Sequence, residues 1–417
     1  MNFVKNYQCT LCHKVFEARA DLLTCPLCGE KGVLEINYDY DKMKKIVSPT
    51  YFQNNSDYTM WRYLPMMSVE DTKLLPTLKI GWTPLYNTPH LGDILGIKNL
   101  YVKDEGLNPT ASLKDRASGV AVIKAMEIGQ KVIACASTGN AASSLAGNAA
   151  RMGLKSVIFV PKRAPLGKLA QLMVFGATVI SVDGDYKDAF NLSKAAIDHY
   201  HWYNRNAAIN PHLVEGKKTV ALEIAEQMHF QVPDWVAVSV GDGCTIAGVY
   251  KGFFDFYQLG MIDKIPKILG IQSTGCAPFV EAFKQKRYLQ EVAENTIADS
   301  ISVGIPRNPQ KAINAVSKSQ GTWIAVSDEA ILAAMKLLGK TEGIFGEPAG
   351  TASVAGVKQA IQDGIIKSTD TVVIIMTGNG LKDPANAVKA AGSPIIMKPN
   401  LQEFIQYMEK KDKEVSI

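Results

Sequence analysis

From about residue 97 onward, short runs of β-branched residues alternate with segments that have helical periodicity. This alternation is typical of an α/β protein with mostly parallel sheets and helices on both faces. Helices are predicted between most of the strands, for example over residues 113–128 and 213–228. The predicted strands indicate two α/β lobes that face each other across a cleft, and they cover residues 100–103, 132–136, 157–160, 178–182, 235–240, 268–271, 323–326 and 371–376.

The composition narrows the class of protein. The chain has 417 residues, 47% of them hydrophobic and 20% charged, as expected for a globular protein with more than one cored domain. Its net charge of +5 comes without a dense Lys/Arg run, so we expect small anionic ligands and no nucleic-acid partner. The first residues contain no apolar segment of signal-peptide length, and no run of about 18 uncharged apolar residues occurs. We therefore expect a cytoplasmic protein that makes no membrane contact.

Four of the seven cysteines form two C-x-x-C pairs near the start of the chain, Cys9 with Cys12 and Cys25 with Cys28. This spacing suits a small zinc ribbon, in which four thiolates surround one Zn²⁺ ion. In a reducing compartment these thiols are metal ligands or free thiols rather than disulfides. The sequence therefore predicts a structural zinc site, and a ribbon that keeps its thiols without metal is the alternative.

Ligands of open α/β sheets gather beyond the carboxyl ends of the strands, so the residues that follow each strand are the candidates for a site. Lys114 lies in such a place, in a run over residues 108–116 that follows a strand and opens a helix. At the first turn of a helix the dipole lowers the pKa of an ammonium and favours the neutral amine that imine formation needs. On its own, a surface lysine in a helix-opening K-D-R run explains the same residues.

Three further strand ends carry polar or glycine-rich clusters. A serine, a threonine and an asparagine at a helix start suit a substrate carboxylate and a phenolate oxygen, and these are Ser137, Thr138 and Asn140. A loop of small residues allows consecutive N–H groups to surround a phosphate, and it comprises Gly241, Asp242, Gly243, Cys244 and Thr245. Thr377, after the last long strand, offers a neutral hydroxyl to a ring nitrogen. With Lys114, these clusters meet the four needs of pyridoxal phosphate and an amino-acid substrate.

At these motifs the chain resembles the threonine synthases, a family of the tryptophan-synthase-like pyridoxal-phosphate enzymes of fold type II. The similarity extends from about residue 61 to 384 and includes W-R-Y at 61–63, G-W-T-P-L at 81–85, A-C-A-S-T-G-N at 134–140, G-I-F-G-E-P-A at 343–349 and T-G-N-G-L-K-D-P at 377–384. The last of these motifs resembles threonine synthases more than serine/threonine dehydratases or cysteine synthases.

The resemblance implies a role for each cluster. Lys114 holds the cofactor as a Schiff base and moves protons, and Asn140 hydrogen-bonds the ring 3′ oxygen. The loop from Gly241 to Thr245 binds the cofactor phosphate, and Thr377 faces the pyridine nitrogen. Ser137 and Thr138 meet the substrate carboxylate. The implied reaction is γ-elimination of phosphate from O-phospho-L-homoserine and β-addition of water to give L-threonine, in a homodimer.

The chain departs from the family where the substrate phosphate is usually held. Ala208 stands in place of a serine, and Leu213 in place of the arginine that normally pairs the phosphate. An Arg–phosphate contact is a charge-assisted, often bidentate bond, so its loss weakens the binding of a phosphorylated substrate. His212 or Lys217 compensates if the loop is shifted by one residue. Asp242 adds an acid beside the phosphate loop, where capping of the next helix also explains it.

Two other functions therefore stay open. One is a paralogue that performs β-elimination, β-replacement or C–C cleavage on an unphosphorylated small amino acid. The other is a non-catalytic binding protein that carries a ribbon on the same fold. The expected organisation is a ribbon-like module at 1–35, an extension packed on the large domain at 36–96, a region at 97–215 with a smaller mobile lobe at about 125–180, a large cofactor-binding lobe at 216–390 and a helical tail at 391–417.

Overall fold

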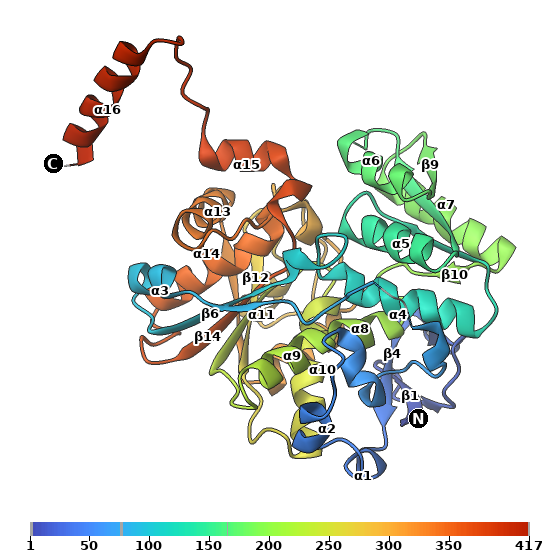
Figure 1. The fold of residues 1–417 in the computed structure, drawn as a ribbon. Coiled ribbons are helices and arrows are strands. Elements are labelled where there is room, and N and C mark those ends of the chain that lie inside the picture. Colours follow the sequence, from blue (N-terminus) through green and yellow to red (C-terminus); the bar gives the residue numbers. More distant parts are fainter. Residues whose placement is uncertain (1–2, 76–77, 165, 416–417) are drawn as a thin grey trace.

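The computed structural model describes residues 3–75, 78–164 and 166–415, and it has two α/β lobes joined side by side (Figure 1). The larger sheet has the order β13-β12-β11-β14-β6-β5. Its strands are parallel except β5, which pairs antiparallel with β6. The strands are β5 (Leu85–Asn87), β6 (Asn99–Asp104), β11 (Trp235–Ser239), β12 (Lys267–Ser273), β13 (Thr322–Val326) and β14 (Thr371–Met376).

The smaller sheet is parallel throughout and has the order β10-β7-β8-β9. Its strands are β7 (Val132–Ala136), β8 (Lys155–Pro161), β9 (Thr178–Val182) and β10 (Tyr203–Asn204). The eight strands predicted from the β-branched runs are confirmed, because strands with helices on both faces read as continuous apolar runs. The short strands β5 and β10 were not predicted, since three and two residues give too little pattern.

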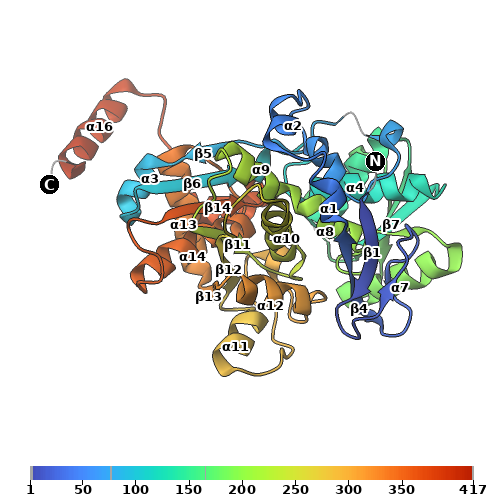
Figure 2. The same cartoon turned by 90° about the horizontal axis from the view of Figure 1, so that it is seen from below.

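Helices cover both faces of the two sheets, as Figure 2 shows for the larger sheet. The α-helices of the body are α3 (Pro89–Leu95), α4 (Lys114–Glu127), α5 (Asn140–Arg151), α6 (Leu166–Val174), α7 (Tyr186–Tyr200), α8 (His212–Lys217), α9 (Thr219–Gln227), α10 (Cys244–Leu259), α11 (Pro278–Gln285), α12 (Pro309–Lys318), α13 (Asp328–Glu342), α14 (Pro348–Gln362) and α15 (Pro384–Ala391). Short 3₁₀ helices are η1 (Met60–Met66), η2 (Thr72–Leu74), η3 (Glu105–Leu107), η4 (Asp299–Ile301) and η5 (Gly380–Lys382).

One helix prediction was wrong. The expected single helix over 213–228 is divided at Lys218 into α8 and α9. Thr219 Oγ1 donates a hydrogen bond to the Gly216 carbonyl oxygen at 2.7 Å, and such a side-chain bond competes with the helical ladder. The break sets the end of α8 apart as a separate short element beside α4 and α10.

The N-terminal segment forms a four-stranded antiparallel module, β2-β1-β4-β3, on the large lobe. Its strands are β1 (Val4–Cys9), β2 (Val15–Phe16), β3 (Thr24–Cys25) and β4 (Gly29–Tyr38), and α1 (Tyr40–Met43) and α2 (Pro49–Gln53) follow. Lys311 and Lys251 of the large lobe donate to the carbonyl oxygens of Leu34 and Ile36 at 2.6 and 2.8 Å. Both lysines also pair with Glu35, so charged contacts fix β4 to the body.

At the other end of the chain, α16 (Leu401–Val415) projects away from the body in both views (Figures 1 and 2). Among the described residues, no helix is both long enough and apolar enough to cross a membrane.

Candidate active site

The loop before α4 brings Lys114 next to the end of β14. The Leu113 backbone N–H donates to the Thr377 carbonyl oxygen at 2.9 Å, and the Asn379 N–H donates to the Ala111 carbonyl oxygen at 3.0 Å. Ala111 adopts a φ of 65°, in the left-handed region that few non-glycine residues occupy. The main chain itself therefore holds the predicted lysine and Thr377 together, although 262 residues lie between them in the sequence.

A buried charge network fixes the helix that carries Lys114. Arg116 pairs with Glu105 at 2.7 Å and with Glu223 at 2.5 Å, and Lys103 pairs with Glu223 at 2.7 Å. Burial alone would raise the pKa of Glu223, but the charges of Arg116 and Lys103 lower it to about 2. Glu223 is therefore ionised, and the network ties α4 to η3, β6 and α9.

Asp115 anchors the same turn on its other side. Its carboxylate accepts hydrogen bonds from the Thr110 N–H at 2.7 Å, the Thr110 hydroxyl at 2.9 Å and the Asn148 amide at 2.9 Å. Burial raises the pKa of Asp115 to about 6, and these hydrogen bonds oppose the rise. The residue after Lys114 thus fastens the lysine loop to α5 of the smaller lobe.

The Lys114 amine is prepared to lose its proton. The pKa of Lys114 is lowered to about 8. Burial is the main cause, the positive charges of Lys217 and Arg205 act in the same direction, and the charge of Glu347 opposes them. The sequence also predicts a lowered pKa for Lys114. That prediction attributes the shift to the helix dipole, whereas burial is the largest cause in the structure. Lys114 forms no ion pair with the residues that the structure describes.

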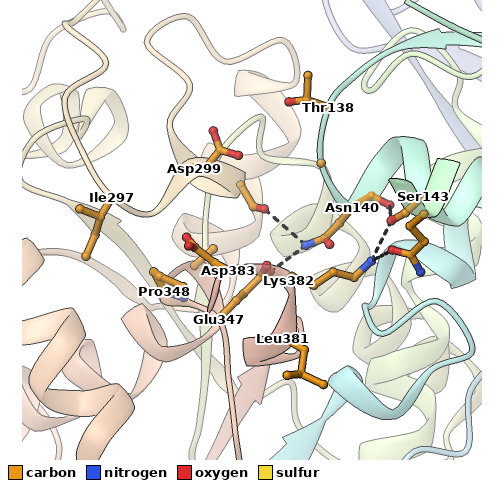
Figure 3. A pocket seen from close by; sticks show the side chains of 14 residues that line it. Thr138, Asn140, Ser143, Ile297, Asp299, Glu347, Pro348, Leu381, Lys382 and Asp383 are labelled. Atoms are coloured by element: carbon orange, nitrogen blue, oxygen red, sulfur yellow. Dashed lines mark hydrogen bonds between the residues drawn. The ribbon is translucent and has the colours of Figure 1, made fainter. Parts of the chain in front are cut away.

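Asn140 links the two lobes across a cavity (Figure 3). Its amide Nδ2 donates to Glu347 Oε1 at 2.7 Å and lies 3.4 Å from Ser300 Oγ. Glu347 precedes α14, and its own N–H donates to the Gly378 carbonyl oxygen at 2.9 Å. Burial raises the pKa of Glu347 to about 7, whereas the charge of Lys114 and the Asn140 hydrogen bond lower it. This carboxyl group can therefore hold or release a proton near neutral pH.

The cavity itself measures about 90 Å³ and lies between the ends of the two sheets. Lys382 enters it from the large lobe and donates to Ser143 Oγ at 2.9 Å and to Gln171 Oε1 at 2.7 Å (Figure 3). Thr138 and Asn140 line it from the smaller lobe, and Glu347 lines it from the large lobe. Groups from both lobes meet here, which suits a substrate that is enclosed when the lobes close.

The phosphate loop has the shape that a cradle requires. Gly243 has a φ of 87°, and a Cβ there would lie 2.8 Å from the Ala312 Cβ and 2.9 Å from the Asn308 carbonyl oxygen. Gly243 is the N-cap of α10 and offers no side chain to cap it, so the first-turn N–H groups of α10 have no side-chain acceptor. Because helix N-termini attract anions, this loop fits the phosphate of the cofactor.

The interpretation of Asp242 as the N-cap of α10 is wrong, because Gly243 is the N-cap and no side chain caps the helix. The Asp242 carboxylate accepts from the Arg307 N–H at 3.2 Å and lies 3.8 Å from the Arg307 guanidinium. Asp242 therefore fastens the loop to residues 307 and 308 instead of occupying the helix end.

Thr377 and Ser137 are the remaining predicted donors. The Thr377 side chain is 7% exposed, and its hydroxyl forms no hydrogen bond with the described residues. Ser137 Oγ accepts from the Gly139 N–H at 3.2 Å, which shapes the turn before α5. A half-buried lysine of low pKa, a hydroxyl without a partner among the described residues and an uncapped helix start together fit the reactive aldehyde, ring nitrogen and phosphate of pyridoxal phosphate.

Comparison with known proteins decides the family. The model of the family described as "Pyridoxal-phosphate dependent enzyme" matches residues 76–378. The chain belongs to this family. Pyridoxal phosphate is its cofactor, and the predicted fold type II is confirmed for the two lobes.

Curated relatives place this pyridoxal-phosphate enzyme among the threonine synthases. It is 44% identical to threonine synthase of Methanocaldococcus jannaschii, over 93% of this chain and 95% of that protein. It is 39% identical to threonine synthase of Mycobacterium tuberculosis, over 81% of this chain and 92% of that protein. Among solved structures, diaminopropionate ammonia lyase of Escherichia coli matches the fold with a TM-score of 0.65 and 18% identity, over 78% of this chain and 94% of that chain.

At positions 208 and 213, where the sequence departs from the family pattern, this pyridoxal-phosphate enzyme has no side chain that could donate to a phosphate. Leu213 is fully buried in the hydrophobic core of the smaller lobe, with Ala117, Ala121 and Ile133. Ala208 packs beside Cys244 at the phosphate loop. His212 does not compensate, because its ring lies 2.8 Å from Ser68 Oγ and packs against Tyr7 of the N-terminal module.

Sequence reasoning missed one acid of the site. Glu347 is part of the G-I-F-G-E-P-A motif, but the sequence alone predicts no role for it. Its signal is local, since it is the one charged residue of that motif and directly precedes a proline that opens a helix.

The four N-terminal cysteines come together in space. The sulfur atoms of Cys9, Cys12, Cys25 and Cys28 all lie within 4.8 Å of one another. A Cβ at Gly32 would lie 2.5 Å from the Cys25 Cβ, 2.7 Å from the Cys28 Cβ and 3.3 Å from the Cys9 Sγ, so only glycine fits beside the cluster. Four thiols in such a group suit tetrahedral Zn²⁺ coordination.

Proposed function

We propose that this enzyme is a threonine synthase that releases phosphate from O-phospho-L-homoserine and adds water at Cβ to give L-threonine. The observation that supports it most is 44% identity to a curated threonine synthase over 93% of this chain. When bound, pyridoxal phosphate supplies an aldehyde that bonds to the Lys114 amine and a ring that withdraws electrons from the substrate.

Lys114 is the catalytic base in this proposal. A pKa of about 8 leaves roughly a tenth of the amine neutral at pH 7, far more than an ordinary lysine would have. A neutral amine can take the proton from the substrate Cα and return a proton later. Glu347, with a pKa of about 7, is the second proton-holding group next to it.

The other predicted site residues bind and orient. Asn140 would turn the N–H that now points to Ser300 Oγ, 3.4 Å away, to the ring 3′ oxygen, while its other N–H holds Glu347. Residues Gly241 to Thr245 would hold the cofactor phosphate, and Thr377 would donate to the pyridine nitrogen. Ser137 and Thr138 would bind the substrate carboxylate beside the start of α5. Burial of Asn140, Thr377 and residues 243–245 supports this arrangement, because it excludes water from the cofactor atoms that they would hold.

We also propose that the lobe at about 125–180 moves toward the large lobe when substrate binds. The boundaries 1–35, 36–96, 97–215, 216–390 and 391–417 are our working domain division. The N-terminal module would carry one structural Zn²⁺ on its four cysteines, and the enzyme would act as a homodimer in the cytoplasm.

The direct test is release of inorganic phosphate from O-phospho-L-homoserine by the purified holoenzyme, with chromatographic detection of threonine. Lys114→Ala is the control variant and should lose both products. Absence of phosphate release at millimolar substrate, together with turnover of serine or threonine, would instead establish the paralogue that acts on an unphosphorylated amino acid.

A further inference from the structure

Two buried cations near Lys114 lack the carboxylate partner that the other buried cations of the described chain have. Nine lysine and arginine residues are buried, and Arg205 and Lys217 form no ion pair with a described residue. A buried charge without a counter-ion is costly, so these two indicate an anion that is supplied from outside the chain. The other seven pair with Asp or Glu, and they are Arg62, Lys103, Arg116, Lys124, Lys218, Lys251 and Lys311.

Arg205 lies at the carboxyl end of β10, where its N–H donates to the Ala134 carbonyl oxygen at 2.9 Å. Among the residues that the structure describes, its guanidinium donates only to the Ser118 hydroxyl, from Nε at 3.1 Å and from Nη2 at 3.0 Å. Ser118 is one helical turn after Lys114 on α4, so it lies on the same face of that helix. The guanidinium therefore reaches the Lys114 side of α4 with N–H groups still to be satisfied.

Lys217 also lies near Lys114, because its positive charge, like that of Arg205, lowers the pKa of Lys114. It ends α8, and its Cβ lies 2.9 Å from the position that a Cβ at Gly248 would take on α10. Burial lowers the pKa of Lys217, while Cys244 and Asp242 oppose that effect. Asp242 is paired with Arg307, so it does not serve as the counter-ion of Lys217.

We infer that Arg205 and Lys217 bind the phosphate group of the substrate, in place of the donors that Leu213 and Ala208 do not provide. This inference rests on the proposed threonine synthase activity. In this chain the arginine follows β10, as Arg205, instead of lying on α8 as in the family pattern. The α8 position is taken by Leu213, which packs in the hydrophobic core. Two cations of fixed position suit a phosphate monoester dianion.

The cofactor carries a phosphate of the same chemistry, so the test must separate the two sources. The first-turn N–H groups of α10 already suit the cofactor phosphate, whereas Arg205 directly follows β10 of the smaller sheet. We therefore assign the two cations to the substrate and treat the cofactor phosphate as the competing outcome.

The experiment uses the full-length holoenzyme and two ligands that differ only in the phosphorus group. One is 2-amino-5-phosphonopentanoate, which resembles the substrate but cannot lose its phosphonate, and the other is norvaline. Isothermal titration gives Kd for each ligand in wild type, Arg205→Gln and Lys217→Met. We expect each substitution to raise the phosphonate Kd by about 10- to 100-fold and the norvaline Kd by less than about 2-fold.

Three controls complete the test. Lys358→Met removes a charge from the exposed face of α14 and should change neither Kd. Arg205→Lys retains the charge and should recover part of the phosphonate preference. Thermal melting of each variant shows whether it is folded, and Lys217→Met with Arg205→Lys carries the test if Arg205→Gln does not fold.

An unchanged ratio of the phosphonate Kd to the norvaline Kd in both variants would overturn the inference. If the Kd for pyridoxal phosphate also rises strongly in these variants, the two cations bind the cofactor phosphate instead. A wild-type enzyme that prefers norvaline to the phosphonate would instead contradict the proposed function itself.

Discussion

Glu347 accepts a hydrogen bond from the Asn140 amide at 2.7 Å, and this contact joins the large lobe to the smaller lobe above Lys114. The two residues are 207 positions apart in the chain, yet both stand at the start of a helix. Through this contact, the position of Asn140, which is predicted to bind the cofactor, depends on the charge of Glu347. The charge of Glu347 therefore influences both the contact between the lobes and the Lys114 amine.

The first prediction concerns that charge. A Glu347 carboxylate favours the protonated form of Lys114, so Glu347→Gln should lower the Lys114 pKa below about 8. The pH midpoint for the reaction of apoenzyme with pyridoxal phosphate, followed by absorbance, should move to lower pH. Glu329→Gln, on the exposed start of α13, should leave the midpoint in place. A pH midpoint that is higher in Glu347→Gln than in the wild type would contradict the predicted direction of the pKa shift.

A second prediction concerns the phosphate loop. Gly243→Ala should weaken binding of pyridoxal phosphate strongly, because the new methyl group would meet Ala312 and the Asn308 carbonyl oxygen and displace the loop. Gly260→Ala is the matched control, since it also has a positive φ, 72°, but has open space around its Cβ. The control should lose only about 1 kcal/mol of stability and keep its cofactor affinity. Equal cofactor affinities in the two variants would refute this account of the loop.

Arg116 supplies the third prediction, on stability. Arg116→Met would leave Glu105 and part of the Glu223 charge uncompensated in the core, and should cost about 3–5 kcal/mol of unfolding free energy. Urea denaturation measures this loss. Arg19→Met breaks an exposed pair with Asp21 and should give no measurable change.

The pH dependence of stability gives the fourth prediction. The pKa of Asp115 is about 6 in the folded enzyme, against an ordinary value of 3.8, so the folded state binds the proton more tightly. The stability contribution from this group is therefore complete below about pH 4 and is lost as the pH rises through about 6. Relative to Asp115→Asn, the wild type should gain stability as the pH falls from 7 to 4. A pH-independent difference between the two would exclude the effect.

The fifth prediction tests the cysteine cluster. Elemental analysis should find one zinc per chain in the wild type and none in Cys12→Ser, because three thiolates do not complete the tetrahedron. Cys276→Ala, which removes a buried thiol far from the cluster in sequence, should retain the metal. Zinc-free wild type purified without chelator would favour a ribbon that keeps its thiols without metal.

The sequence by itself determined the eight long strands, the helix that starts at Lys114 and the clusters that follow four strand ends. These features are local, because strand runs and helix starts are encoded within a few neighbouring residues. The resemblance to threonine synthases was equally readable, since its motifs are short and occur in order.

Tertiary structure decided what those clusters face. The pairing of Glu347 with Asn140, the contact of Asp242 with Arg307 and the lone hydroxyl partner of Arg205 all join residues that are far apart in the chain. Whether a buried charge has a counter-ion depends on which elements pack against it, and no local pattern contains that information. For this reason the sequence identified the missing arginine at Leu213, while only the fold could indicate Arg205 as its replacement.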